Sequence, residues 1–148
     1  MLTFAMIKPH VVKNPIALNK ILQTIEDNSF KIVRKTRIKF NQHSAEKFYE
    51  EHKGKFYFNR LITFMMSGET EALILERNDA IKKWRELLGP TKVFKTIYSH
   101  PESIRGLYGI TDTRNACHGS DSEQSVIEEI RKIFPDFEFD PSVKSKFV

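Results

Sequence analysis

The chain has 148 residues, of which 40% are hydrophobic, and a formal net charge of +5. This length suits a single hydrophobic core, so we expect one domain over residues 1–148, with a variable C-terminal tail from about residue 135. The longest apolar-looking run, residues 61–66, is far shorter than the ~20 residues of a membrane-spanning helix, and the only cysteine, Cys117, excludes an internal disulfide and a multi-cysteine zinc site.

The first 40 residues predict two strands with a helix between them. Residues 2–7 are apolar except for Thr3 and indicate a buried strand. No basic leader precedes them, which favours a strand over a signal peptide. Asn14 and Pro15 favour the start of a helix that runs to residues 27–29, because Asn caps well and Pro suits the first turn. Residues 30–40 alternate apolar and basic side chains, as a half-exposed strand does.

The rest of the chain predicts mainly helices. Four elements follow in order: a helix over 44–51 with Ser44 as its cap, a short helix over 59–66, a strand over 71–75 and a helix over 79–88 that Gly89-Pro90 ends. Residues 92–103 have no clean period and predict a long loop. A final helix covers 122–134 and stops at Pro135. This order predicts an α/β fold of the α+β sandwich type, with a ferredoxin-like core in which helices cover an antiparallel or mixed sheet, the antiparallel form being preferred.

One histidine stands out from the other four. His118 is followed by Gly119, which removes bulk beside the ring, and then by Ser120 and Asp121 at the start of the last helix. A helix N-terminus attracts phosphate through free N–H groups and the helix dipole. Glu129, on the same helix, is placed to hold one ring nitrogen and leave the other as a nucleophile.

Cations for a phosphate group are also available. Lys8 ends the first predicted strand, and Arg85, Arg105 and Arg114 are separate candidates. Basic residues are otherwise spread along the whole chain, so we expect no dedicated nucleic-acid surface. From the residues alone, the interpretation is a phosphate-binding α/β domain with one reactive histidine.

Several motifs in order resemble one enzyme family. Residues 115–122 resemble the N-x-x-H-G-S-D signature of the nucleoside diphosphate kinases, and the similarity extends through 5–9, 64–68 and 103–106. Residues 100–103 and 112–115 resemble the divergent branch called nucleoside diphosphate kinase 6. The resemblance implies exchange of the γ-phosphoryl group between nucleoside triphosphates and diphosphates, by a ping-pong mechanism with Mg²⁺.

The resemblance also implies a role for each matching residue. His118 would carry the phosphoryl group, Glu129 would orient its ring, and Tyr49 would bond near both. The residues that would hold the nucleotide are Lys8, Arg85, Thr91 and Arg105 on the phosphates, Asn115 on the ribose, and Tyr57 and Leu61 at the base. No residue is expected to bind the metal directly, and Asp121 would reach it through water at most.

The chain departs from the family pattern at four places, one of which is the C-terminal tail after Pro135. His10 stands where the family mostly has Asp, Asp112 replaces an apolar residue near the base, and the loop over 91–105 is longer. That loop contributes to the family's hexamer, so we expect a homo-oligomer in which a dimer is favoured. The alternative function is a nucleotide-binding scaffold with weak or no turnover that acts through a protein partner. The expected location is cytoplasmic, with association with mitochondria as a second expectation.

Overall fold

The computed structural model describes residues 1–143, so the end of the expected C-terminal tail, 144–148, lies outside the described residues. The strands are β1 (Leu2–Ile7), β2 (Lys31–Lys39), β3 (Glu69–Glu76) and β4 (Cys117–Gly119). The helices are α1 (Pro9–Val12), α2 (Pro15–Asp27), α3 (Gln42–Phe48), α4 (Phe58–Met65), α5 (Ala80–Leu88), α6 (Val93–Ser99), α7 (Ile104–Tyr108) and α8 (Glu123–Ile133), with a 3₁₀ turn η1 (Glu50–His52) after α3.

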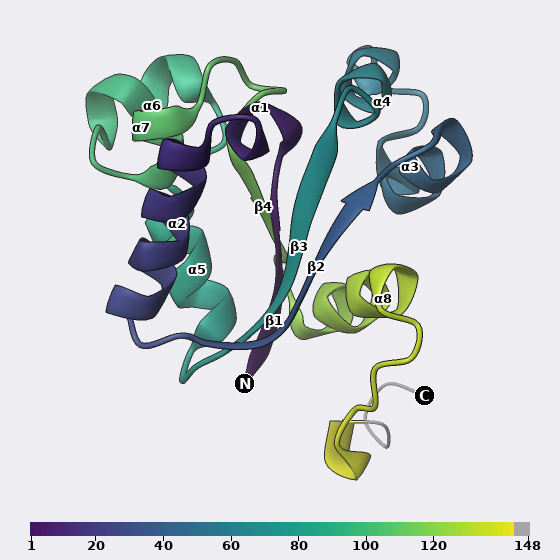
Figure 1. The fold of residues 1–148 in the computed structure, drawn as a ribbon. Coiled ribbons are helices and arrows are strands. Elements are labelled where there is room, and N and C mark those ends of the chain that lie inside the picture. Colours follow the sequence, from purple (N-terminus) through teal and green to yellow (C-terminus); the bar gives the residue numbers. More distant parts are fainter. Residues whose placement is uncertain (144–148) are drawn as a thin grey trace.

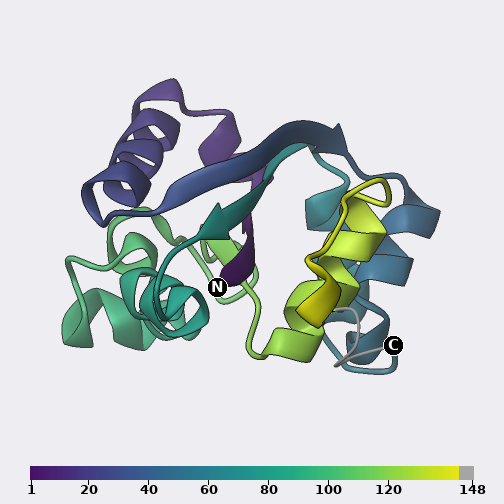
Figure 2. The ribbon, with the colours of Figure 1, turned by 90° about the horizontal axis from the view of Figure 1, so that it is seen from below.

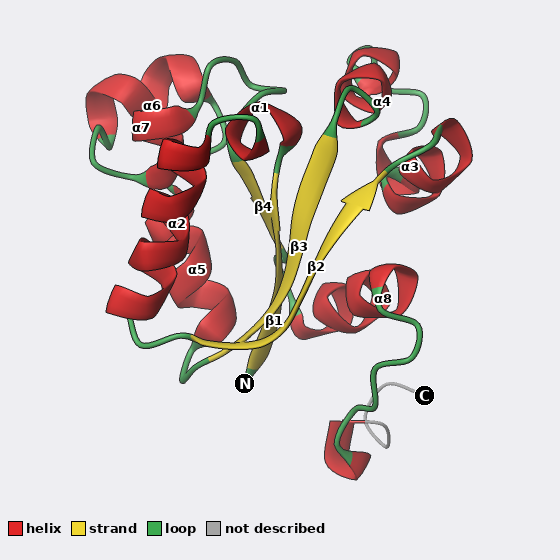
Figure 3. Ribbon diagram, viewed as in Figure 1, coloured by secondary structure: helices red, strands yellow, loops and turns green. Residues whose placement is uncertain are grey.

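The four strands form one antiparallel sheet in the order β2-β3-β1-β4. Helices α2 and α5 cover one face, and α3, α4 and α8 lie on the other side (Figures 1 and 2). Colouring by secondary structure shows the strands as a central layer between the two sets of helices (Figure 3). The predicted fold class is confirmed: a ferredoxin-like strand order with helices over an antiparallel sheet.

Alternation along β1 produces a separate core on each face of the sheet. Phe4 and Met6 pack into the cluster beneath α3, α4 and α8, whereas Ala5 and Ile7 pack against α2 and α5. Because both faces are covered, β1 is apolar except for the buried Thr3. The short strand β4 pairs with β1 so that His118 lies opposite Met6. The site histidine is thereby attached to the most buried part of the sheet.

The predicted loop over 92–103 is wrong, because the segment contains helix α6 and leads into α7. Its helical face consists of only two buried side chains, Val93 and Thr96, so no amphipathic pattern is visible. The Thr96 hydroxyl donates to the carbonyl of Pro90 at 2.7 Å, and Ser103 caps α7 by accepting from the Gly106 N–H at 3.0 Å.

The start of the third main helix differs as well. Asn41, not Ser44, is the N-cap of α3, and its side chain accepts from the Ser44 N–H at 2.8 Å. The Ser44 hydroxyl accepts in return from the Asn41 N–H at 3.0 Å, which completes a capping box with Ser at the third helical position. Helix α1 was not predicted, because its four residues are too few to show a period.

Candidate active site

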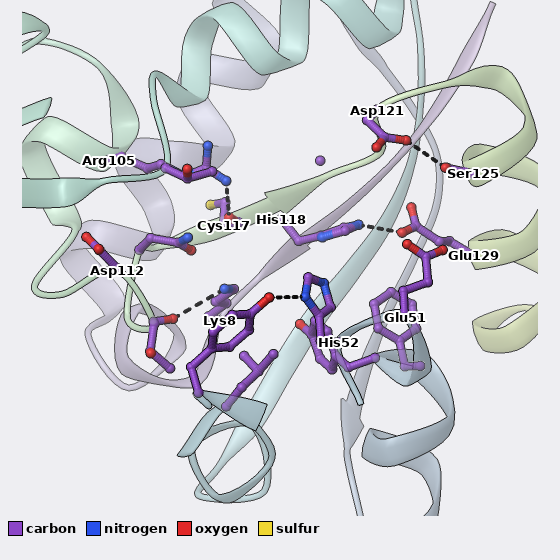
Figure 4. Close-up of a pocket in the computed structure, with 18 of the residues that line it drawn as sticks. Lys8, Glu51, His52, Arg105, Asp112, Cys117, His118, Asp121, Ser125 and Glu129 are labelled. Carbon is purple, nitrogen blue, oxygen red and sulfur yellow. Dashed lines mark hydrogen bonds and ion pairs between the residues drawn. The ribbon is translucent and has the colours of Figure 1, made fainter. Parts of the chain in front are cut away.

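A cleft of about 460 Å³ opens beside β4. Its walls come from β4, α8, the η1–α4 segment and the stretch from α5 to α7 (Figure 4). All of the residues to which the resemblance assigns a role line this cleft: Lys8, Tyr49, Tyr57, Leu61, Arg85, Thr91, Arg105, Asn115, His118, Asp121 and Glu129. The fold therefore brings together side chains from both ends of the chain. Their individual roles stay predictions.

The His118 ring is held through one nitrogen only. Nε2 donates to Oε2 of Glu129 at 2.9 Å, and the other Glu129 oxygen accepts from the buried hydroxyl of Ser120. No hydrogen bond from the described residues reaches Nδ1. Donation from Nε2 to a carboxylate selects the tautomer with a lone pair on Nδ1. The ring is therefore fixed with Nδ1 free, which is the arrangement that a nucleophilic histidine would need (Figure 4).

The backbone around this histidine is tightly constrained. Ala116 has φ +77°, a left-handed conformation that costs a non-glycine residue about 1 kcal/mol or more. The indole Nε1 of Trp84 donates to the His118 carbonyl at 3.1 Å. A Cβ at Gly119 would lie 2.8 Å from Cδ1 of Trp84, so this glycine permits α5 to pack against β4. From the sequence, Gly119 was instead expected to leave space beside the His118 ring.

Two buried cations lie on the other side of the cleft. Lys8 is 5% exposed, and its ammonium donates to the Thr113 carbonyl at 3.3 Å. Burial, together with the nearby Arg105, lowers the pKa of Lys8 to about 7. The Arg105 guanidinium donates to the carbonyls of Gly89 at 2.7 Å and Cys117 at 3.0 Å. Burial lowers the pKa of Arg105 to about 10, so it remains charged near neutral pH.

Two further polar groups have no partner within the described residues. The hydroxyl of Tyr49 and Oδ1 of Asn115 are both buried and unbonded, and both residues line the cleft. Burial and the neighbouring Glu129 raise the pKa of Tyr49, so the phenol keeps its proton and remains a donor. Unpaired buried polar atoms cost about 1–3 kcal/mol each. One donor and one acceptor are thus available to a ligand in the cleft.

Two candidates lie differently from the sequence-based expectation. Arg114 is not among the residues that line the cleft, and its guanidinium stacks over Phe64 at 5.4 Å. Asp112 does line the cleft, but Oδ1 accepts from the Val93 N–H at 3.0 Å, at the start of α6. Asp112 thus helps to begin the helix that the sequence did not predict.

The carboxylates of the cleft do not form a metal cage. Within residues 1–143, no group of three or more His, Cys, Asp or Glu side chains is placed to hold a metal ion. Asp121 accepts from the Ser125 hydroxyl at 2.7 Å, and this bond is the main reason why the pKa of Asp121 is lowered. These residues fit a cation that would be carried by an anionic ligand rather than held by the protein.

The sequence did not predict a role for three groups that the structure places at the cleft. The hydroxyl of Ser120 holds Glu129, although this serine lies inside the motif that carried the prediction. The carbonyl of Thr113 holds Lys8, and a backbone atom leaves no sequence signal. His52, which was grouped with the ordinary histidines, lines the cleft. No helix in the described part of the chain has the length and apolar character needed to cross a membrane.

Comparisons with known proteins agree with the geometry. The family model described as "Nucleoside diphosphate kinase" matches residues 2–139. The chain is 48% identical over 136 residues to human nucleoside diphosphate kinase 6, covering 92% of this chain and 73% of that protein. The solved structure of the Aquifex aeolicus enzyme has a TM-score of 0.86 at 37% identity, covering 90% of this chain and 94% of the other. The Halobacterium salinarum enzyme, solved with CDP, has a TM-score of 0.85 at 30% identity, covering 99% and 97%.

Proposed function

Because this chain belongs to the nucleoside diphosphate kinase family, we propose that it transfers the γ-phosphoryl group of a nucleoside triphosphate to a nucleoside diphosphate through phosphorylated His118. One observation carries the proposal: the His118 ring is bonded to Glu129 through Nε2, and its Nδ1 is free in a cleft with buried cations. A fixed imidazole with one free lone pair is suited to covalent catalysis.

The proposed reaction consists of two phosphoryl transfers. In the first, the Nδ1 lone pair attacks the γ-phosphorus, the bond to the bridging β,γ-oxygen breaks, and the diphosphate leaves. In the second, a β-phosphate oxygen of the acceptor diphosphate attacks the same phosphorus, and the N–P bond breaks. Glu129 accepts the Nε2–H hydrogen bond throughout and stabilises the positive charge that develops on the ring. The neutral histidine is regenerated with no net proton transfer.

The nucleotide would be held by groups common to all nucleotides. Lys8, Arg85, Thr91 and Arg105 would bind the phosphates, and the unpaired Oδ1 of Asn115 would accept from a ribose hydroxyl. The base would stack on Tyr57 beside Leu61, a contact that any base can make. We therefore expect weak discrimination among bases.

Mg²⁺ belongs to the substrate in this proposal. The ion would be carried on the nucleotide phosphates, and Asp121 would contact it through water at most. When bound, the ion neutralises charge on the phosphate oxygens. No residue of the chain needs to supply a direct ligand.

A labelling experiment tests the proposed activity. The chain is incubated with γ-labelled ATP and Mg²⁺, and GDP is then added. We expect an acid-labile label on the protein that is transferred to GDP. Nucleotide binding without any label on the protein would reject the enzyme and favour the scaffold function, in which the chain acts through a protein partner.

We also propose a homo-oligomer in which a dimer is favoured over a hexamer. Strand β2 is an open edge of the sheet and is available for a two-fold contact. The longer segment over 91–105 folds into α6 and leads into α7, where Phe94, Tyr98 and Leu107 are exposed, so the surface for a three-fold contact is altered. Light scattering at micromolar concentration should give a mass of two chains. A stable mass of six chains would refute this assembly without affecting the catalytic proposal.

A further inference from the structure

His52 is the second histidine of the cleft. Of the five histidines, only His118 and His52 line it. His52 ends η1, and its Nδ1 is hydrogen-bonded to the hydroxyl of Tyr57. The two ring centroids are 5.5 Å apart with an interplanar angle of 60°. Figure 4 shows the His52 ring below His118 in the centre of the cleft, with this bond as a dashed line.

The His52 ring connects two functional parts of the cleft. On one side its centroid is 6.1 Å from that of Tyr49, whose pKa the charge of Glu129 helps to raise. On the other side it bonds Tyr57, the ring proposed to stack on the base. A continuous series of rings therefore runs from the reaction centre to the base position.

From the preceding turn, Tyr57 is contacted by the ring of Phe56, edge to face at a centroid distance of 5.4 Å. Residues 53–56 are all exposed, Gly54 has φ +88°, and the neighbouring Phe56 is 93% exposed. Tyr57 itself is half-buried and packs against the core with its ring, while its hydroxyl ends on His52. Because the turn before Tyr57 is exposed, the hydrogen bond to His52 adds a second point of attachment for this ring, beside its packing against the core.

We propose that His52 is a positioning residue that holds Tyr57 in the orientation on which the nucleotide base stacks. This inference rests on the proposed function, because it concerns binding at the same site. His52 does not act on the phosphoryl group: His118 is oriented separately, through Glu129 and Ser120. Loss of the His52–Tyr57 bond therefore weakens binding of the base and leaves the chemical step unchanged.

The test compares ligands with and without a base. Dissociation constants for GDP and for inorganic tripolyphosphate are measured by calorimetry for the parent, His52→Leu, Tyr57→Phe and the double variant. A single hydrogen bond is worth enough to change binding about threefold to tenfold. We expect GDP binding to weaken by this factor in each single variant and by no more in the double variant, because both changes remove the same bond. Binding of tripolyphosphate, which has no base, should remain at the parent value.

Further variants separate positioning from simple loss of structure. His52→Gln retains hydrogen-bonding groups and should restore most of the GDP affinity, and His43→Leu, an exposed change on α3, should match the parent. Phosphorylation of His118 at saturating ATP should stay within about twofold of the parent in His52→Leu, His52→Gln and His43→Leu. If His52→Leu does not fold, Tyr57→Phe, which removes only a hydroxyl, decides the matter.

The outcomes distinguish this inference from the proposed function. A parent that neither binds GDP nor takes up the label would reject both. If the parent is active but His52→Leu and Tyr57→Phe bind GDP as tightly as the parent does, only the positioning role is rejected. Equal losses of GDP and tripolyphosphate affinity would also reject it, because they would indicate general damage to the cleft.

Discussion

Replacing His118 by alanine will abolish the phosphoenzyme and reduce phosphoryl transfer by several orders of magnitude, while nucleotide binding stays close to the parent value. The substitution removes Nδ1, the free ring nitrogen, and with it the atom that would form the covalent bond. The residues proposed to bind the phosphates and the ribose are other residues of the cleft, so this substitution leaves them in place. Labelling with γ-labelled ATP and calorimetry with GDP measure the two effects separately.

The matched control for this variant is His43→Ala, a change to an exposed histidine on α3. The His118 ring also packs near Phe4 and Phe48, at centroid distances of 6.1 and 5.6 Å, so thermal unfolding must be recorded for both variants. Transfer by a folded His118→Ala protein at a rate near that of the parent would contradict the central proposal.

Replacing Lys8 by methionine will slow transfer and make the fold more stable. A charge-assisted hydrogen bond to phosphate is worth about 1.5–3 kcal/mol, so kcat/KM should fall about tenfold to a hundredfold. In the free protein, however, the Lys8 cation is buried beside Arg105, and its pKa is lowered to about 7. Methionine has a similar length and no charge, so it removes the cost of burying the ammonium.

The pKa shift of Lys8 also predicts how the free energy of unfolding depends on pH. The pKa of Lys8 is about 7 in the folded state, whereas a solvent-exposed lysine of the unfolded chain has its ordinary pKa of 10.5. Between these values the unfolded chain binds more protons, so the free energy of unfolding contributed by Lys8 rises with pH, by up to about 1.4 kcal/mol per pH unit. The contribution is complete above the unfolded pKa and is lost as the pH falls through the folded pKa. Lys8→Met should remove this slope.

The useful pH window is bounded by another buried group. Burial raises the pKa of the Cys117 thiol from 9.0 to about 12, which makes stability fall with rising pH above about 9. Denaturant unfolding between pH 7 and 8 therefore isolates Lys8. Lys20→Met, an exposed change on α2, serves as the control. If the parent and Lys8→Met have the same slope, the burial cost assigned to Lys8 is wrong. Arg105→Ala is a poorer test, since Arg105 also bonds the carbonyls of Gly89 and Cys117.

Much of the secondary structure could be predicted from short stretches of the sequence. The Asn14 cap, which accepts from the Ala17 N–H at 3.3 Å, together with the three- and four-residue apolar spacing, was sufficient to predict α2. The alternating residues 30–40 likewise predicted β2, and the strong stop at Gly89 marked the end of α5. Each of these signals acts within a few residues. Residues 115–122 indicated the family because the motif is contiguous in the sequence.

Only the tertiary structure decided which side chains meet. Lys8 and the Thr113 carbonyl are 105 residues apart, and Arg105 reaches the same cleft from α7. The antiparallel register of β1 with β4 is what brings them together, and long-range pairing leaves no mark in a short window of sequence. For the same reason Arg114 was one of the candidate cations, although it does not line the cleft, and His52 was given no role. Spacing along the chain predicts which face a residue shares with its neighbours, but packing of the whole sheet decides what it faces.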